Sequence, residues 1–141
     1  RHRIYRLRDM EGNQIDASFM LEEVEGELSV YLESRGGTKG TPAARNTRYS
    51  EGLALLLRRL QAQGAILESV RLVTRKETRD LALSIPFPVL LSKPSDLDLL
   101  RSEIQRAQGN NSTRRIQLVV SAKHSVSAQE WARFLMAGDG S

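Results

Sequence analysis

The chain has 141 residues and a net charge of +4, a length that suits one hydrophobic core and is too short for two domains of ordinary size. It contains no cysteine, which excludes disulfides, thiolate zinc sites and cysteine nucleophiles and fits a cytoplasmic protein. No apolar run approaches the roughly 18 residues that a membrane span needs, so we expect no membrane partner.

The first part of the chain predicts antiparallel strands. Residues 3–8 should form a short strand that turns near Gly12 and Asn13, and residues 15–21 alternate apolar and polar side chains with a period of two. Residues 28–33 repeat the alternation, so residues 22–26 should connect the two strands of a β-hairpin. The polar face of this hairpin is largely acidic.

A basic, glycine-rich loop then leads into an amphipathic helix. Residues 35–48 hold several Lys and Arg and no acidic residue. The helix is expected to begin near Asn46 or Thr47, either of which could cap it, and to end at Gly64. Apolar residues at helical spacing form one stripe of this helix, which should pack on a sheet: Tyr49, Leu53, Leu56, Leu57 and Leu60. Arg58, Arg59, Gln61 and Gln63 lie outside this stripe.

The second half predicts two more strands and two more helices. Residues 66–74 form a central strand, and residues 81–94 carry three prolines that favour an extended connector on the core. Ser95 should cap a helix that residues 109–111 end, and residues 113–121 should form a further strand. A capping box that begins at Ser127 should open a last helix, which Gly138 ends. The predicted fold class is α+β, a mixed β-sheet with about three helices packed mainly on one face.

Basic residues gather in three places that are far apart in the sequence. Between Asp9 and Ser34 there are eight acidic residues and no Lys or Arg, whereas from Arg35 onward seventeen basic residues stand against nine acidic ones. If the two strands after the first helix run parallel, the three clusters meet, and such a groove suits the phosphates of a nucleic acid. Charges spread over a solvated surface are the alternative. The clusters lie at residues 35–48, at Arg75, Lys76 and Arg79, and at Arg106, Arg114 and Arg115.

Catalytic motifs are scarce. His2 and His124 are the only histidines, so neither a structural zinc site nor a histidine-metal nuclease motif can be assembled, and we expect no cofactor. There is no GK[ST] phosphate loop and no GxSxG elbow. The best case for an enzyme is a metal-dependent nuclease that uses Asp96, Asp98 and Lys93, although acidic residues in the first turn of a helix need no metal to explain them.

Several segments together carry a family resemblance. Five segments follow one another in the order seen in the N-terminal head domain of McrA-type modification-dependent (type IV) HNH restriction endonucleases. They are LSVYLESRGG, RNTRYSEGLALLLRRLQAQGA, ILESVRLVT, STRRIQLVVS and SVSAQEWARFLMAGDG. The resemblance covers about residues 9–139. It implies one modified-DNA-binding domain over residues 1–141, a fragment that lacks Met at its start and whose C-terminal HNH nuclease domain is absent.

The resemblance implies a function in bacterial defence. The partner would be double-stranded DNA that carries modified cytosine, 5-methylcytosine or 5-hydroxymethylcytosine, in a preferred sequence context. This chain alone would not be an enzyme, whereas the full-length protein would be an HNH restriction endonuclease in the bacterial cytoplasm. A homodimer could form through the C-terminal domain. A methyladenine reader, a stand-alone nuclease and a protein-interaction module built on the acidic hairpin are the alternatives.

Residues 35–48 and 110–115 match the parts that would approach DNA. A cytosine methyl group projects into the major groove, and we expect it to be read within the intact duplex rather than by base flipping. The proposed methyl contacts are Thr38, Thr41, Pro42 and Ala43. Asn110 is a further polar candidate, and the predicted DNA-binding set is Arg35, Lys39, Arg45, Asn46, Arg48, Arg75, Lys76, Arg79, Asn111, Ser112, Thr113, Arg114 and Arg115.

Overall fold

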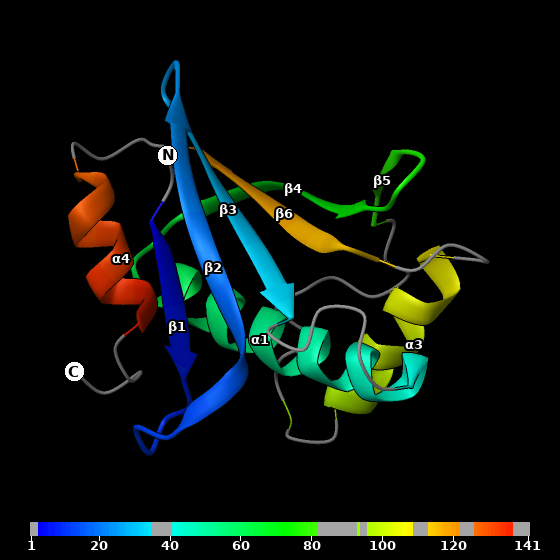
Figure 1. Cartoon of the computed structure of the whole chain (residues 1–141). Helices are drawn as coiled ribbons and strands as arrows, with labels where there is room; N and C mark the ends of the chain where they lie inside the picture. Colours follow the sequence, from blue (N-terminus) through cyan, green and yellow to red (C-terminus); the bar gives the residue numbers. More distant parts are fainter. Residues whose placement is uncertain are drawn as a thin grey trace.

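One six-stranded sheet organises the computed structural model, which describes residues 3–34, 41–81, 93, 96–108, 113–121 and 126–136 (Figure 1). Within these residues there are also three helices, so the α+β class is confirmed. Across the sheet the strands are β1 (Ile4–Arg8), β2 (Gln14–Val24), β3 (Glu27–Ser34), β6 (Arg115–Ser121), β4 (Ile66–Val73) and β5 (Thr78–Asp80). The helices are α1 (Pro42–Ala62), α3 (Asp96–Gln108) and α4 (Ala128–Met136).

Every pair of neighbouring strands in the sheet is antiparallel, so the predicted mixed sheet is wrong. The prediction assumed that a helix between β4 and β6 would carry the chain back along the sheet, as in a parallel crossover. Instead β5 reverses direction beside β4, and α3 packs against α1. The chain therefore starts β6 at the end of the sheet where β4 stops.

The turns between the first three strands follow from backbone conformations. Between β2 and β3 only Glu25 and Gly26 form the turn, with φ of 50° and 80°, which is the left-handed pair that a two-residue hairpin turn requires. The hairpin is confirmed, but its strands are longer than predicted. The turn near Gly12 is also confirmed: this residue has a φ of 88°, and the backbone N–H of Asp9 donates to the carbonyl of Asn13 at 2.8 Å.

Helix α1 begins earlier than the sequence predicted. Thr41 is the N-cap, because its side-chain oxygen accepts from the backbone N–H of Ala44 at 3.1 Å, and Pro42 occupies the first turn, where its missing N–H costs nothing. The predicted start near Asn46 or Thr47 is therefore wrong. The predicted end is confirmed: Gln63 is the C-cap, and Gly64 after it has a φ of 69°, the left-handed conformation that commonly ends a helix.

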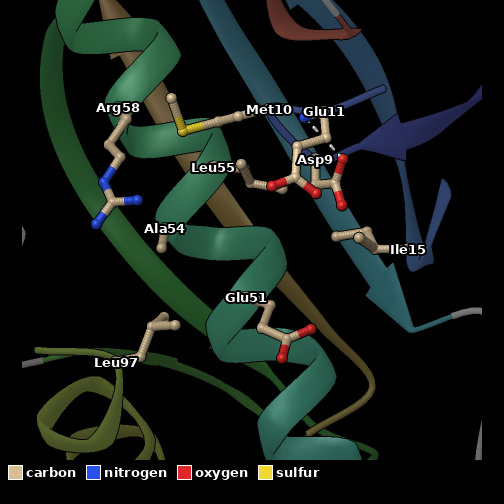
Figure 2. Close-up of a pocket in the computed structure, with 9 residues that line it drawn as sticks. All are labelled: Asp9, Met10, Glu11, Ile15, Glu51, Ala54, Leu55, Arg58 and Leu97. Atoms are coloured by element: carbon tan, nitrogen blue, oxygen red, sulfur yellow. Dashed lines mark hydrogen bonds between the residues drawn. The ribbon is translucent and has the colours of Figure 1, made fainter. Parts of the chain in front are cut away.

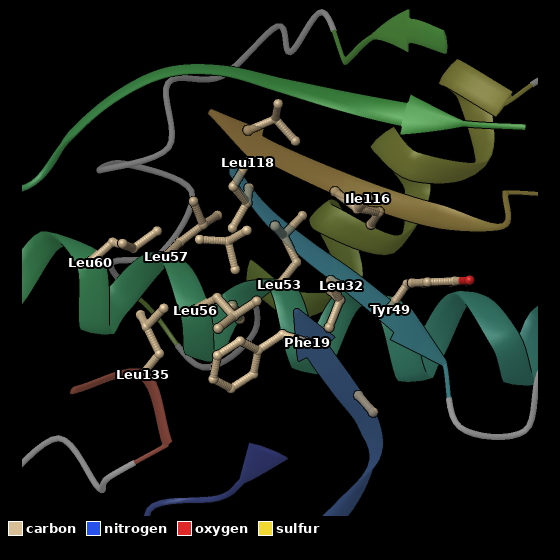
Figure 3. Packing of buried hydrophobic residues seen from close by; sticks show 14 of the residues in the cluster. Phe19, Leu32, Tyr49, Leu53, Leu56, Leu57, Leu60, Ile116, Leu118 and Leu135 are labelled. Atoms are coloured by element: carbon tan, nitrogen blue, oxygen red, sulfur yellow. The ribbon is translucent and has the colours of Figure 1, made fainter. Parts of the chain in front are cut away.

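The leucine stripe of α1 packs on one face of the sheet, as Figure 3 shows. All five predicted members of the stripe are buried, against alternate residues of the strands such as Phe19, Leu32, Ile116 and Leu118. Gly52 lies where α1 comes closest to β3, since a Cβ there would stand 2.8 Å from Cδ1 of Leu32. Helix α4 covers β1 and β2 beside α1 (Figure 1).

The last two helices each bury an apolar face. In α3 the side chains of Leu100 and Ile104 are fully buried, and in α4 those of Trp131 and Leu135 are buried. Ser127 accepts from the backbone N–H of Glu130 at 3.2 Å, as a capping box requires. The expected connector, apart from Leu81 and Lys93, lies outside the described residues. So do Ser95, residues 109–111 and Gly138.

Arg59 is a polar side chain that the sequence did not place in the interior. It lies off the leucine stripe yet is only 2% exposed. Its guanidinium donates to the carbonyl of Leu135 at 2.7 Å and to the carbonyl of Arg8 at 2.6 Å. One side chain of α1 thereby ties the end of α4 to the end of β1.

Candidate nucleic-acid interface

The antiparallel order brings three chain segments to one end of the sheet. The register pairs Leu32 of β3 with Ile116 and pairs Val73 of β4 with Arg115, so both strands end where β6 begins. The first turns of α1 lie against the same end (Figure 1). We call this region the basic end; its described members are Arg45, Arg48, Arg75, Lys76, Arg79, Arg114 and Arg115.

Helix α1 is fastened to this end by two consecutive residues. The Nε of Arg48 donates to the side-chain oxygen of Ser34, the last residue of β3, at 2.7 Å. The hydroxyl of Tyr49 donates to the carbonyl of Arg114, just before β6, at 2.5 Å. The described members of the basic end therefore lie together, although the parallel strands from which this was predicted do not exist. Arg106, the remaining described residue of the third cluster, lies on α3 and forms an ion pair with Glu103 at 2.5 Å.

The second cluster sits on a tight turn between β4 and β5. The side-chain oxygen of Thr74 accepts from the backbone N–H groups of Lys76 and Glu77, at 3.3 and 3.2 Å, and donates to the carbonyl of Glu77 at 3.0 Å. Arg75 and Lys76 project from this turn, are exposed, and have no ion-pair partner among the described residues. Two cations are therefore held on an ordered backbone with their charges open to solvent.

Arg79 differs from its two neighbours. Its Nε donates to the carboxylate of Glu77 at 2.6 Å, and its Nη1 donates to the carbonyl of Ala107 in α3 at 3.2 Å. The side chain therefore fastens the β4–β5 turn to the last turn of α3. Its guanidinium already has a carboxylate and a carbonyl as partners, whereas Arg75 and Lys76 have no ion-pair partner among the described residues.

The third cluster has one exposed and one supported arginine. The backbone N–H of Arg114 donates to the carbonyl of Val73 at 2.7 Å, while its side chain is exposed and makes no ion pair within the described part of the chain. The guanidinium of Arg115 lies over the ring of Tyr31 at 5.4 Å from the ring centre. Arg115 thus lies against the sheet face opposite α1, because Tyr31 alternates with the inward-facing Leu32.

Two of the predicted polar contact residues are buried. Asn46 in α1 and Thr113 before β6 are each 6% exposed. They lie beside the basic residues but do not face solvent in this structure, so they support the basic end rather than form its surface. Arg45 and Arg48 are half-buried, and Thr41 and Ala43 are exposed at the start of α1.

Several predicted site residues cannot be placed. Arg35, Thr38, Lys39, Asn110, Asn111 and Ser112 lie outside the described residues, as does the side chain of Pro42. Their proposed contacts with DNA stay predictions.

The hydroxyl of Tyr49 is held in its protonated, donating form. Burial raises the pKa of this phenol above its usual value of 10.0, and the carboxylate of Glu33 raises it further. A backbone hydrogen bond with Ser34 and the charges of Arg45 and Arg48 lower the pKa, but burial outweighs them. At neutral pH the hydroxyl therefore keeps the proton that it shares with the carbonyl of Arg114.

Comparison with known proteins identifies the family. Residues 5–138 match the family model described as Type IV restriction enzyme McrA, N-terminal domain. The chain belongs to this family. The predicted resemblance is thereby confirmed over almost the whole chain, whereas no curated protein matches it.

This McrA N-terminal domain has the opposite charge at the other end of β3. The β2–β3 hairpin carries Glu25 in its turn and Glu22, Glu23 and Glu27 in the strand ends beside it, and Glu27 and Ser34 are the first and last of the eight residues of β3. At about 3.3 Å per residue step, the two ends of β3 are roughly 23 Å apart. Anionic and cationic groups are thus separated along one strand, with the cations on the end that α1 braces.

A pocket in the McrA N-terminal domain lies on the β1–β2 side of the sheet, at the end where β3 stops, between the β1–β2 turn, the middle of α1 and Leu97 of α3 (Figure 2). Its volume is about 390 Å³. Asp9, Glu11 and Glu51 contribute three carboxylates to its lining, against the single guanidinium of Arg58. This charge balance suits a phosphate poorly.

The described residues of the domain offer no metal centre. No group of three His, Asp or Glu side chains that could hold a metal ion occurs among them. Asp98, a proposed nuclease ligand, forms an ion pair with Arg101 on the same helix at 2.5 Å. The side chain of Asp96 is outside the described residues, and Lys93 is exposed. None of the helices in the described part is long and apolar enough to cross a membrane.

Proposed function

We propose that this domain binds double-stranded DNA containing modified cytosine through its basic end, and that a separate nuclease domain cleaves the DNA in the bacterial cytoplasm. The observation that carries the proposal is the meeting of three separate basic segments, in which Arg75, Lys76 and Arg114 are exposed and have no ion-pair partner in the described part of the chain. Family membership supports DNA as the partner.

The geometry suits a phosphate backbone. Each Lys or Arg that approaches a phosphate releases condensed counterions, and the guanidinium fork of arginine can bond two phosphate oxygens or a guanine edge. Arg75 and Lys76 project from one turn, and Arg114 is joined to the strand before that turn through Val73. Three cations on neighbouring backbone segments can therefore follow successive phosphates of one duplex.

The start of α1 is where we place recognition of the modification. Thr41 and Ala43 are exposed there, one turn of helix before Arg45, and both present a methyl group. Pro42 and Thr38 complete the proposed apolar contact with the cytosine methyl. A helix N-terminus also carries a partial positive charge, which favours a nearby phosphate.

Reading within the intact duplex is the mode that we propose. A flipped base is usually stacked between aromatic or apolar side chains. Tyr49 and Trp131 are each 3% exposed and belong to the core, so neither is accessible for such stacking. A cytosine methyl in the major groove can instead be contacted without unstacking the base.

Of the three alternatives, the structure supports two less well than the proposed function. The stand-alone nuclease would need a metal cluster, and its one described carboxylate is paired with Arg101. The protein-interaction module would use the acidic β2–β3 turn and would leave the basic end unused. A methyladenine reader would use the same basic end and differs only in the base that is recognised.

Fluorescence anisotropy with four matched duplexes tests the proposal. The duplexes carry no modification, 5-methylcytosine, 5-hydroxymethylcytosine or 6-methyladenine, and each is titrated over a series of salt concentrations with and without Mg²⁺. We expect tighter binding to a modified-cytosine duplex, a steep fall of affinity with salt, and no cleavage. Equal binding of modified and plain duplexes at every salt concentration would contradict the proposal, and Mg²⁺-dependent cleavage would establish the nuclease alternative.

A further inference from the structure

The backbone of Arg114 is held from both sides while its side chain remains exposed. Its N–H donates to the carbonyl of Val73 at the end of β4, at 2.7 Å, and its carbonyl accepts from the hydroxyl of Tyr49 in α1 at 2.5 Å. The peptide segment that presents Arg114 and Arg115 is therefore fixed between a strand and a helix. The two arginine side chains extend from a backbone that cannot shift independently of α1.

We propose that Tyr49 is a positioning residue for DNA binding, and that with Arg48 it forms a clamp which holds Arg114 at the correct place relative to Arg75 and Lys76. The clamp is defined by Arg48 with its partner Ser34 and by Tyr49 with its partner Arg114. This inference rests on the proposed function, because it assigns to the clamp the alignment of cations that bind phosphates.

The second half of the clamp acts on the neighbouring strand. Arg48 precedes Tyr49 in α1, and its Nε bonds the side chain of Ser34 at 2.7 Å. Ser34 is the last residue of β3, so this bond fixes the point from which the chain continues into residue 35. Two adjacent helix residues thus set the relative position of the end of β3, the start of β6 and α1.

Packing alone does not explain the hydroxyl of Tyr49. Its ring belongs to the leucine stripe and is surrounded by core residues, a role that a phenylalanine ring of nearly the same size could fill. The hydroxyl adds a directed bond to one carbonyl, 65 residues further along the chain. That bond orders the backbone before DNA arrives, so binding does not have to order it.

The double-mutant cycle of Tyr49→Phe and Arg114→Ala measures this role. Affinity for a 5-methylcytosine duplex is determined for the wild type, both single variants and the double variant, over a salt series. We expect Tyr49→Phe to bind about fivefold more weakly, and the slope of log affinity against log salt to become less steep by about one as a phosphate contact is lost. In the Tyr49→Phe background, Arg114→Ala should cost less than it does in the wild type.

A matched control separates positioning from a general loss of a hydroxyl. Tyr5→Phe removes a hydroxyl from a tyrosine that stacks on Phe19 at 5.2 Å, at the β1 edge of the sheet. Tyr5→Phe should leave affinity and salt slope unchanged. Unchanged affinity in Tyr49→Phe, or losses that simply multiply with those of Arg114→Ala, would overturn the inference.

The cycle distinguishes failure of the clamp from failure of the proposed function. If the wild-type domain binds none of the duplexes, the proposed function itself fails. If the wild type binds and Tyr49→Phe binds equally well, only the clamp fails. Should Tyr49→Phe not fold, Ser34→Ala applies the same test to the other half of the clamp, with weaker binding and a shallower salt slope expected and unchanged binding overturning the inference.

Discussion

The guanidinium of Arg115 on β6 lies over the ring of Tyr31 on β3, with 5.4 Å between the guanidinium carbon and the ring centre. The Nε2 of Gln117 donates to the Tyr31 hydroxyl at 3.3 Å and to the side-chain oxygen of Ser29 at 3.1 Å. Gln117 of β6 therefore holds the Tyr31 ring in place, and the ring supports the cation of Arg115 from the same strand β6. This contact holds the guanidinium of Arg115 against β3 at the basic end.

Replacing Tyr31 by leucine should weaken DNA binding because Arg115 loses the ring that supports it. A cation–π contact at a partly exposed site is worth about 0.5 to 1 kcal/mol, so we expect affinity to fall about two- to fivefold. Tyr31→Phe keeps the ring and should bind nearly as well as the wild type. Anisotropy titrations of both variants check this, and an equal loss in the two would show that the hydroxyl matters rather than the ring.

Alanine at Arg75 or Lys76 should weaken binding to modified and plain duplexes alike. Both side chains are expected to meet phosphates, which carry no base information. Each substitution should reduce the salt slope by about one. Arg133→Ala is the matched control, since Arg133 is exposed on α4. A change of preference among the four duplexes in the Arg75 or Lys76 variant would contradict a phosphate contact.

Serine at Thr41 should reduce the preference for modified cytosine without loosening the helix. The serine hydroxyl can still accept from the N–H of Ala44, but the side-chain methyl is gone. A methyl group in an apolar contact is worth about 0.8 kcal/mol, so the ratio of affinities for modified and plain duplexes should fall about three- to fourfold. Unaltered preference, with unaltered thermal stability, would remove Thr41 from the proposed contact.

Methionine at Arg59 should destabilise the domain. The substitution leaves the buried carbonyl of Leu135 and the partly buried carbonyl of Arg8 without this donor, and we expect a loss of about 3 kcal/mol in the free energy of unfolding. Urea denaturation measures the loss. Arg58→Met is the neighbouring control; Arg58 lines the pocket and is only half-buried, so its replacement should change stability little.

The stability of the domain should fall more steeply at high pH when Tyr49 is present. Because its folded pKa is raised above the unfolded value of 10.0, the protonated phenol stabilises the fold below that pH, and this contribution is lost as the pH rises through the folded pKa. Urea unfolding of the wild type and of Tyr49→Phe, from pH 8 to about 11, should show a smaller decline in the variant. Parallel declines would indicate that the phenol has no raised pKa.

Local patterns in the sequence predicted the elements well. The leucine stripe of α1 and the alternation in β2 and β3 depend on residues close together in the chain, and both are confirmed. The start of α1 was missed because Asn46 and Thr47 are also good caps. The proline that follows Thr41 was the signal that could have decided between them.

Non-local contacts account for what the sequence could not predict. Strand direction between β4 and β6 depends on how β5 and α3 return the chain, which no periodicity records. The burial of Asn46, Thr113 and Arg59 likewise depends on partners distant in sequence. The basic clusters were expected to meet through parallel strands, whereas the antiparallel register of β6 with both neighbours brings the described members of the basic end together.

The acidic turn between β2 and β3 has a consequence for how the domain first meets its partner. With Glu23 and Glu25 beside one end of β3 and Arg75 and Arg114 near the other, charges of opposite sign form a dipole along this strand. Within about 10 Å of a polyanion at moderate ionic strength, the field of the polyanion turns this dipole so that its cationic end faces the polyanion. Collisions are then oriented before any contact forms, so the association rate should fall steeply as ionic strength rises, more than the dissociation rate changes.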